Sequence, residues 1–560
     1  MKAWNLYTSK EIKPLGWIKR QLEIQAEGLS GNLDKIWKDV RDSSWIGGDA
    51  DGWERVPYWL DGFIPLAYLL DNADMKARAK KYIDSIISSQ CPDGWICPCS
   101  EEERPKYDTW AAILLTKVLT VYYECTSDER IPGVIYSTLK NYYELLKSKS
   151  ISLFWWGKFR WYEAFIAINF LYERYGEPWI KELALILKEQ GADYASFTEL
   201  WKRPINRWRI DTHIVNLGMM LKYEAVSCGI LGDEYKNIAE ELYQFLYKYN
   251  GTPLGMFTGD ECLSGLSPIQ GTELCAVAEQ MYSYELLFAY TGDKKWLERL
   301  ELLAFNAFPA TVSDDMWTHQ YDQMSNQISC ERFPGKSLFR TNGSEAHLFG
   351  LEPNYGCCTA NFNQAWPKFA LSLFMHKDDT VINTVPVPAE LDCNKAYIKL
   401  ETKYPFENCF KYTVKAKEDF CFEIRVPSFA KELTADGVPV NELKFSLNAG
   451  EEREINVSFR TEPYMEARPY GLKTVKCGSL VFSVPIKYEK KMYEYERDGV
   501  ERKFPYCDYE YIPLSDWNYA YSSDELSLIP GELGEVPFSS DSPAVKIKAK
   551  VKKIFAIDKL

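Results

Sequence analysis

Two adjacent cysteines, Cys357 and Cys358, follow a glycine in the middle of the chain, and a Glu-x-Cys pair, Glu273 and Cys275, lies upstream of them. Three thiols and one carboxylate form a complete tetrahedral set of ligands for zinc. A thiolate bound to zinc can act as a ligand, as a nucleophile or as both. Metal-dependent chemistry is therefore the first hypothesis that these residue types suggest.

The predicted helices place all four residues at helix starts. Glu273 and Cys275 open a helical pattern, and although residues two apart diverge along a helix, the first turn can aim both at one ion. Cys357 and Cys358 immediately precede a further helix. The helix dipole at such an N-terminus favours the thiolate form of cysteine. Adjacent cysteines alone are weak evidence, since such pairs are often incidental in a reduced protein.

Other potential ligands form weaker patterns. A histidine-based site is disfavoured because the four histidines have no paired ligand spacing; they are His213, His319, His347 and His376. A second group of thiols has spacing that could suit a metal, and for it we favour a structural or incidental role; it consists of Cys91, Cys97 and Cys99.

The first two thirds of the chain predict one helix after another. From about residue 12 to about residue 375, apolar residues recur at three- and four-residue spacing and are interrupted by Gly and Pro, giving about twelve segments in six hairpin pairs. Examples are residues 58–70, 109–123, 159–171, 212–226, 274–288 and 296–308. Repeated helix pairs form an open solenoid or a closed ring. The long loops rich in Trp, Gly and acidic residues favour a closed (α/α)6 barrel with a pocket at one end.

The last third predicts short strands. Partly alternating, β-branched segments separated by turn residues indicate a β-sandwich; they include residues 380–385, 396–400, 422–426, 478–484 and 545–548. We therefore predict an (α/α)6 barrel catalytic domain over residues 1–376 and a β-sandwich domain over residues 377–560. No flexible linker separates them, so tight packing between the two is expected.

Composition excludes several classes of function. The chain has 560 residues, of which 46% are hydrophobic, which is enough for a sizeable core. A net charge of −14 disfavours a nucleic-acid partner. The N-terminus lacks the apolar segment of a secretory signal, and no stretch reaches the ~18 apolar residues of a membrane span. We expect a soluble, cytoplasmic protein with no membrane partner, in which the fifteen cysteines are reduced; a homodimer stays open.

Residues 271–276 and 356–361, taken together, resemble glycoside hydrolase family 127. The resemblance covers most of the chain. Family members of this kind are retaining β-L-arabinofuranosidases and relatives that act on rare plant sugars, so the resemblance implies a carbohydrate substrate. It also implies a zinc cofactor and Cys357 as the nucleophile. The implied zinc ligands are Glu273, Cys275, Cys357 and Cys358.

A retaining glycosidase also needs an acid/base on the opposite face of the sugar from the nucleophile. The resemblance matches Glu261 to this role, although the segment between Glu261 and Glu273 is shorter than in the family pattern. Asp260 is the alternative. A carboxyl group of this kind works best when its pKa is raised.

Candidate substrate contacts come from several loops. His213 resembles a sugar-contacting histidine of the family, and the other interpretation is a buried, hydrogen-bonded core residue. Trp53 and Asp108 lie in loops before predicted helices and offer an aromatic face and a carboxylate for a sugar ring. His319 and Tyr321 lie in the long connection before the cysteine pair, and we expect them near the pocket.

Two alternatives to a zinc-dependent retaining glycosidase stay open. One is an inverting hydrolase or uronate-processing enzyme of (α/α)6 fold, with two carboxyl groups about 6.5–9.5 Å apart; its candidate acids are Asp49, Asp51, Glu54 and Asp108. The other is a non-catalytic protein in which four closed ligands hold a structural zinc ion.

Overall fold

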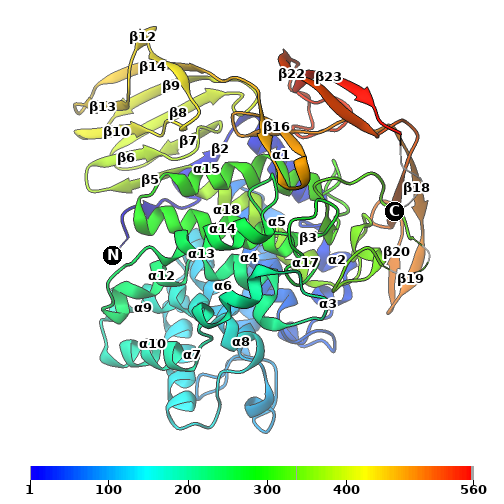
Figure 1. Ribbon diagram of the computed structural model, residues 1–560. Helices are drawn as coiled ribbons and strands as arrows, with labels where there is room; N and C mark the ends of the chain where they lie inside the picture. Colours follow the sequence, from blue (N-terminus) through cyan, green and yellow to red (C-terminus); the bar gives the residue numbers. More distant parts are fainter. Residues whose placement is uncertain (1, 334, 336, 556–560) are drawn as a thin grey trace.

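The computed structural model describes residues 2–333, 335 and 337–555. Helices predominate as far as α18 (Ala365–Leu371), and strands predominate after it. Figure 1 shows the helices as the main body, with two layers of yellow strands above them and separate orange and red strands along the other side. The predicted division into a helical and a sheet-rich part is confirmed.

The longer helices include most of the segments predicted from periodicity. Their bounds are α1 (Gly16–Glu27), α4 (Arg55–Leu69), α5 (Ala73–Ser88), α6 (Trp110–Thr126), α7 (Arg130–Lys147), α9 (Phe165–Tyr175), α10 (Pro178–Gln190), α12 (Tyr223–Leu231), α13 (Ile238–Asn250), α14 (Leu274–Thr291) and α15 (Lys295–Leu302). The shorter helices are α2 (Leu33–Ile36), α3 (Lys38–Arg41), α8 (Trp155–Phe159), α11 (Ile214–Met220), α16 (Phe308–Thr311) and α17 (Cys357–Asn361).

Three predicted helices are broken in the structure. Residues 159–171 divide between α8 and α9 around the 3-10 turn Trp161–Ala164, and residues 212–226 divide between α11 and α12. Residues 296–308 pass through the π-helical segment Leu303–Ala307 before α16 begins. The first break follows Arg160, whose guanidinium donates a hydrogen bond to Asn216 (2.8 Å). Such tertiary contacts override local periodicity.

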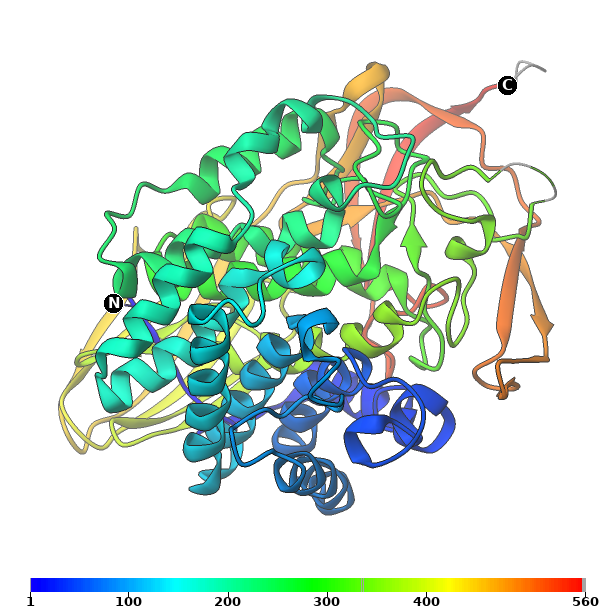
Figure 2. The ribbon, with the colours of Figure 1, turned by 90° about the horizontal axis from the view of Figure 1, so that it is seen from below.

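Helix α14 lies at the centre of the helical part. Almost every side chain along it is buried, which is the pattern of a helix enclosed by others. It packs against α11, α15, α17 and α18, while α4 packs against α5 and α6. Figure 2 shows these helices lying side by side, with the yellow strands at one margin. The start of α14 is therefore a fixed point on which a site can be built.

Buried ion pairs join the central helices. The Asp61 carboxylate of α4 pairs with Lys117 of α6 (2.9 Å) and Lys368 of α18 (2.6 Å). All three side chains are almost fully buried. Removing one partner from a buried pair leaves an uncompensated charge, at a cost of about 3–5 kcal/mol. These pairs fix the relative positions of α4, α6 and α18.

The two largest sheets pack against each other above the helices. One has the strand order β1-β5-β6-β10-β13 and the other β12-β11-β14-β9-β8-β7-β2. The ring of Tyr412 on β9 lies 5.4 Å from that of Phe422 on β10, across the interface. Strand bounds are β1 (Asn5–Leu6), β2 (Ile12–Pro14), β5 (Phe374–Lys377), β6 (Thr380–Asn383), β7 (Ala389–Asp392), β8 (Ala396–Thr402), β9 (Cys409–Ala416), β10 (Phe420–Ile424), β11 (Lys431–Ala435), β12 (Val438–Pro439), β13 (Leu443–Leu447) and β14 (Glu452–Arg460).

The N-terminal segment belongs to these sheets. Strand β1 pairs with β5, and β2 pairs with β7. Strand β5 itself spans the predicted boundary between residues 376 and 377, which stays a prediction. The two ends of the helical part are thus tied to the sheets by backbone hydrogen bonds, which agrees with the expected tight packing.

The remaining strands form small sheets of two or three strands. They are β15 (Tyr464–Ala467), β16 (Lys473–Cys477) and β17 (Leu480–Phe482); β18 (Tyr488–Tyr493) and β21 (Asp508–Pro513); β19 (Tyr495–Arg497) and β20 (Val500–Arg502); and β22 (Tyr519–Pro530) and β23 (Val545–Lys553). The predicted strand over residues 545–548 is confirmed as the first part of β23, which pairs with β22 alone.

Within the described residues, no single helix has both the length and the apolar character that crossing a membrane requires. One bent pair of helices, α11 followed by α12, passes the same test of length and composition.

Candidate metal centre and active site

The start of α14 positions Glu273 and Tyr321 beside each other. Glu273 ends the short strand β3 (Thr272–Glu273), which pairs with β4 (Asp322–Gln323). The backbone N–H of Leu274, the first residue of α14, donates to the carbonyl of Tyr321 (2.8 Å). Backbone pairing therefore brings two segments that are distant in the sequence to one point.

The two adjacent cysteines lie at the start of α17. Cys357 and Cys358 are its first two residues, so the expected placement at a helix start is confirmed. The backbone N–H of Cys275 donates to Cys358 Sγ (3.3 Å), which joins the starts of α14 and α17. Gly356 lets the residue before α17 pack closely against Trp37, because a Cβ there would lie 2.6 Å from the Trp37 indole.

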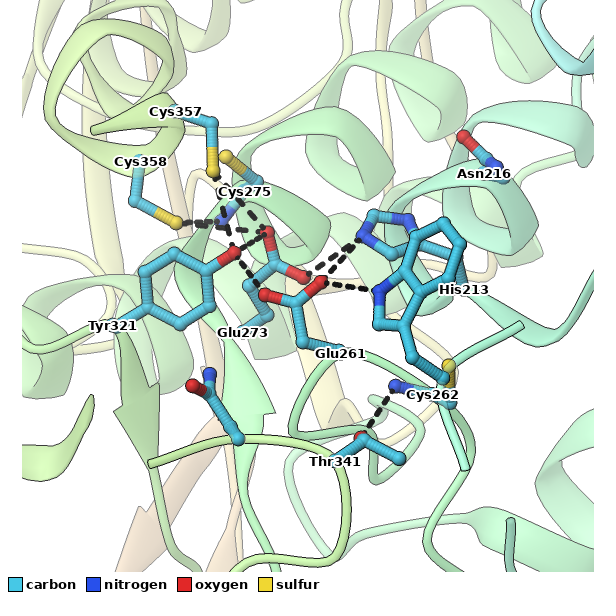
Figure 3. Close-up of polar contacts among 12 residues, drawn as sticks. His213, Asn216, Glu261, Cys262, Glu273, Cys275, Tyr321, Thr341, Cys357 and Cys358 are labelled. Atoms are coloured by element: carbon cyan, nitrogen blue, oxygen red, sulfur yellow. Dashed lines mark hydrogen bonds and ion pairs between the residues drawn. The ribbon is translucent and has the colours of Figure 1, made fainter. Parts of the chain in front are cut away.

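These elements bring together the four residues that the sequence singled out. One ligand atom from each of Glu273, Cys275, Cys357 and Cys358 lies within 4.8 Å of the others. Glu273 Oε1 is 3.9 Å from Cys357 Sγ and 3.7 Å from Cys358 Sγ. Glu273 Oε2 is buried and has no hydrogen-bond partner. Figure 3 shows the three sulfur atoms and this carboxylate converging. Such a group can hold a metal ion.

The three thiols differ in exposure and in protonation. Cys275 and Cys358 are buried, whereas Cys357 is partly exposed. Contacts with the thiols of Cys275 and Cys358 hold the pKa of Cys357 well below its usual value. Burial raises the pKa of the other two thiols. The cysteine that is partly exposed is thus the one whose thiol is most readily deprotonated.

The hydroxyl group of Tyr321 lies between the thiol cluster and a second carboxylate. Its oxygen is 2.6 Å from Glu261 Oε1, 3.1 Å from Glu273 Oε1 and 3.3 Å from Cys357 Sγ. Burial raises the pKa of Tyr321 well above its usual value, so the hydroxyl keeps its proton. A single hydroxyl oxygen therefore separates the Cys357 sulfur from the Glu261 carboxylate (Figure 3).

Backbone hydrogen bonds fix Glu261 in an unusual conformation. Its φ is 143°, a value that non-glycine residues rarely adopt. Its carbonyl accepts a hydrogen bond from Ile214 N–H (2.8 Å), while Leu263 N–H donates to the carbonyl of Thr212 (3.1 Å). Strained backbone of this kind persists only where the surroundings enforce it, and it clusters at functional sites.

Two side chains hold the other oxygen of Glu261. His213 Nε2 is 3.2 Å from Glu261 Oε2 and 3.6 Å from Glu273 Oε2. The indole N–H of Trp208 donates to Glu261 Oε2 (3.1 Å). His213 is buried, and its Nε2 lies within ion-pair distance of both carboxylates in the interior of the site.

Asp260, the alternative acid, has its oxygens engaged elsewhere. It accepts hydrogen bonds from Ser264 Oγ and from the backbone N–H groups of Arg340 and Thr341, the last at 3.0 Å. These contacts tie the loop after Gly259 to the loop around residue 340. Asp260 therefore holds the loop that carries Glu261.

Three further residues that the sequence predicted to contact the substrate make hydrogen bonds to other parts of the protein. His319 is fully buried, with Nε2 3.1 Å from Thr359 Oγ1 and Nδ1 2.8 Å from the carbonyl of Gln320. Both oxygens of Asp108 accept backbone N–H groups. Trp53 donates its indole N–H to the carbonyl of Asp108 (3.1 Å). These contacts are within the protein, and the predicted roles in substrate binding stay predictions.

Two further acids proposed for an inverting pair, Asp51 and Glu54, are also engaged by the protein. Asp51 accepts the backbone N–H groups of Trp53 and Arg55, both at 3.1 Å. Glu54 is buried and accepts hydrogen bonds from Trp110 Nε1 (2.8 Å) and Arg55 (2.5 Å). Among the described residues, the only groups placed to hold a metal are the thiol cluster and the set formed by His213, Glu261 and Glu273. Cys91, Cys97 and Cys99 form no such group.

Sequence reasoning missed four aromatic residues near the site. The ring of Trp156 lies 5.0 Å from that of His213, and the ring of Trp208 lies 6.1 Å from it. Trp155 lies 5.6 Å from Trp208. On the Cys357 side, the half-exposed ring of Tyr355 lies 5.7 Å from that of Tyr321. The adjacent tryptophans Trp155 and Trp156, which open α8, were the sequence signal that could have identified the aromatic group beside His213.

Among the comparisons with known proteins, the one with solved structures identifies the fold. No family sequence model and no curated protein sequence matches the chain. Among solved structures, it is similar to a glycoside hydrolase family 127 β-arabinofuranosidase, with a TM-score of 0.65 and 14% identity over 91% of this chain and 94% of the other. A second structure, described as a glycoside hydrolase, gives a TM-score of 0.65 and 13% identity over 91% and 95% of the two chains.

A third similar structure is a family 127 β-L-arabinofuranosidase from Geobacillus stearothermophilus T6. Its TM-score is 0.63, with 14% identity over 91% of this chain and 97% of the other. Over the 91% of the chain that is matched, helices and sheets together therefore have the fold of these family 127 glycoside hydrolases, as the resemblance in the sequence implied.

Proposed function

We propose that this protein is a zinc-dependent retaining glycoside hydrolase that cleaves a β-linked L-arabinofuranoside or a related plant sugar. Cys357 is the nucleophile and Glu261 is the acid/base. The observation that carries the proposal is the position of Cys357: it is the one partly exposed cysteine of the cluster, and one hydroxyl oxygen separates its sulfur from Glu261. The fold shared with family 127 enzymes supports it, and we further propose that the helices form an (α/α)6 barrel.

The thiol cluster suits zinc better than other common metals. Thiolate ligands select soft or borderline ions, and three thiols with one carboxylate complete a tetrahedral site. The unpartnered oxygen of the buried Glu273 carboxylate supports a cation at this place. When bound, zinc would keep the thiols deprotonated and make the sulfur of Cys357 a better leaving group.

In the first step, Cys357 Sγ attacks the anomeric carbon of the sugar. A carbon–sulfur bond forms as the bond to the leaving oxygen breaks, and Glu261 in its acid form donates a proton to that oxygen. The hydroxyl group of Tyr321 donates a hydrogen bond to Glu261 Oε1 and contacts Cys357 Sγ, so it fixes the position of the acid/base relative to the nucleophile. His213 and Trp208 hold the other oxygen of Glu261.

In the second step, a water molecule replaces the leaving group. Glu261, now a carboxylate, takes a proton from the water as its oxygen attacks the anomeric carbon. The carbon–sulfur bond breaks and returns the electron pair to Cys357. Two displacements on opposite faces give net retention at the anomeric centre.

The distances favour retention over inversion for this pair. Inverting enzymes keep their two catalytic groups about 6.5–9.5 Å apart so that a water molecule fits between them. Two contacts of 2.6 Å and 3.3 Å that share the Tyr321 oxygen cannot span that range. A purely structural zinc site is also disfavoured, because such a site has no reason to hold one partly exposed ligand beside a glutamate with a strained backbone.

The decisive experiment is to trap the sugar on the enzyme. The protein is incubated with a β-L-arabinofuranosyl probe that bears a bromoacetamide group, digested and analysed by mass spectrometry. A label on Cys357 in the wild type and its absence in Cys357→Ser support the proposal. Label on another residue, or none while the enzyme hydrolyses the parent glycoside, would overturn the assignment of the nucleophile.

A further inference from the structure

Three tryptophans form a continuous aromatic surface that begins at the acid/base. The indole N–H of Trp208 donates to Glu261 Oε2 (3.1 Å). The ring of Trp208 lies 5.6 Å from that of Trp155 and 6.0 Å from that of Trp156. Trp156 also lies edge-on to His213 at 5.0 Å. Trp155 and Trp156 open α8 and Trp208 lies in a loop about fifty residues later, so their meeting is a property of the tertiary structure.

Exposure increases along this surface. Glu261 is only 6% exposed, Trp208 and Trp156 are partly buried, and Trp155 is 51% exposed. An indole is among the largest apolar groups in a protein, and leaving it in water forgoes the stabilisation that its burial would give. The surface therefore leads from the buried catalytic carboxylate to solvent.

The backbone at the exposed end is both strained and firmly held. Trp155 has a φ of 45°, in the left-handed region that bulky residues avoid. The Asp108 carboxylate accepts the N–H groups of Trp156 (2.8 Å) and Gly157 (2.9 Å), and also that of Trp110 (3.0 Å). These hydrogen bonds hold Trp155 in a strained conformation that leaves half of its side chain exposed, and strain of this kind clusters at functional sites.

We propose that Trp155, Trp156 and Trp208 bind the leaving group of the substrate, and that this leaving group is a second sugar ring. This inference rests on the proposed function. In a retaining glycosidase the acid must reach the leaving oxygen, so the leaving group lies on the side of the acid. The Glu261 side of the site is the side that carries the three indoles, and sugar rings pack their C–H faces on such surfaces.

The inference assigns a role to Asp108 as well. With both oxygens accepting backbone N–H groups, Asp108 acts through the start of α8, which carries Trp155 and Trp156. It is a positioning residue for the leaving-group site. The substrate class is then a di- or oligosaccharide with a terminal arabinofuranose or related sugar, rather than a glycoside of a small alcohol.

The test compares two substrates that share the terminal sugar and differ in the leaving group. Trp155→Ala is assayed with methyl β-L-arabinofuranoside and with a β-L-arabinofuranosyl-arabinose disaccharide. We expect kcat/KM to fall about tenfold or more for the disaccharide and to stay within about twofold for the methyl glycoside. Trp517→Ala is the matched control, because Trp517 is similarly exposed (43%) and lies between β21 and β22.

Each other outcome decides against the inference. An equal loss on both substrates would mean that Trp155 only supports the fold of the site, and no loss on the disaccharide would mean that no sugar binds there. A loss confined to aryl glycosides, tested with the p-nitrophenyl compound, would assign the surface to aromatic leaving groups instead.

A separate readout distinguishes failure of this inference from failure of the proposed function. If the wild type hydrolyses neither substrate, the proposed function fails, and binding is then measured through tryptophan fluorescence in the Cys357→Ser background. A dissociation constant for the disaccharide that rises about tenfold with Trp155→Ala still supports the sugar site. An unchanged constant overturns it.

Discussion

The hydroxyl oxygen of Tyr321 lies 3.3 Å from Cys357 Sγ. The same oxygen is 2.6 Å from Glu261 Oε1 and 3.1 Å from Glu273 Oε1. One buried phenol therefore contacts the proposed nucleophile, the proposed acid/base and one ligand of the candidate metal centre. A group in this position can orient the carboxyl group of Glu261 through each step without itself losing a proton.

Tyr321→Phe tests that relationship. A hydrogen bond to a charged group contributes about 1.5–3 kcal/mol, so kcat/KM should fall about ten- to a hundredfold while zinc content is unchanged. The measurement is steady-state kinetics together with metal analysis. Tyr284→Phe is the control, because Tyr284 is a buried phenol whose oxygen contacts Gln280 instead. Equal effects of the two substitutions would contradict the role given to Tyr321.

Cys357→Ser tests the nucleophile. A hydroxyl group in place of the thiolate should reduce kcat by at least about 10³-fold, because the covalent step is lost. The circular dichroism spectrum and the thermal transition should stay close to those of the wild type. Cys409→Ser, at an exposed cysteine on β9, provides the control. Normal turnover in Cys357→Ser would show that another group attacks the sugar.

Metal analysis tests the candidate metal centre. We expect one zinc per chain, and we expect Glu273→Gln and Cys275→Ser to bind it more weakly because each removes a ligand. Chelation should abolish activity, and added zinc should restore it. Cys99→Ser is the control, since Cys99 lies in the group that forms no ligand cluster. Loss of zinc in that variant, or full activity of the metal-free protein, would refute this arrangement.

Glu261→Gln tests the acid/base. A missing general acid typically costs about 10²–10⁴-fold, and the loss should be largest for substrates whose leaving group most needs a proton. With a p-nitrophenyl leaving group, the first step should be much less affected. The measurement is a series of leaving groups of graded pKa.

Asp260→Asn separates the two adjacent acids. Asp260 accepts backbone N–H groups of Arg340 and Thr341, so its substitution should lower the free energy of unfolding by about 1–3 kcal/mol. The dependence of rate on the leaving group should stay that of the wild type. If Asp260→Asn, and not Glu261→Gln, changes that dependence, the assignment of the two acids is reversed.

His319 predicts a dependence of stability on pH. Burial lowers its pKa from 6.5 to about 4 in the folded protein. Between these two values the unfolded chain binds the additional proton, so the free energy of unfolding decreases as the pH falls from about 6.5 to 4. Because a tenfold difference in proton affinity corresponds to about 1.4 kcal/mol, His319 contributes on the order of 3 kcal/mol at most.

His319→Asn measures this contribution. Urea unfolding of the wild type and of the variant is followed from pH 4 to pH 8, in each case with zinc in excess. The difference between the two curves isolates His319, because the other titrating groups are common to both proteins. The variant should lose less stability on acidification. Parallel curves would mean that His319 does not titrate in this range.

The sequence alone identified the residues proposed here to carry the chemistry. Potential metal ligands at helix starts can be recognised in a sequence, because the type of each side chain and the signals that begin a helix are local properties of the chain. Glu273, Cys275, Cys357 and Cys358 were found in this way, and the fold was expected from periodicity and from the resemblance to family 127. Periodicity placed α4, α6 and α14 within a few residues of their observed bounds.

Only the tertiary structure decided what each neighbouring residue does. Glu261 and Asp260 are adjacent acids in the sequence, and hydrogen bonds from distant loops direct one to Cys357 through Tyr321 and the other to the backbone of Arg340 and Thr341. The aromatic surface of Trp155, Trp156 and Trp208 depends on the start of α8 and a distant loop, which meet only after folding. The physical reason is that burial, strain and hydrogen-bond partners are set by long-range contacts, which no local pattern of residues records.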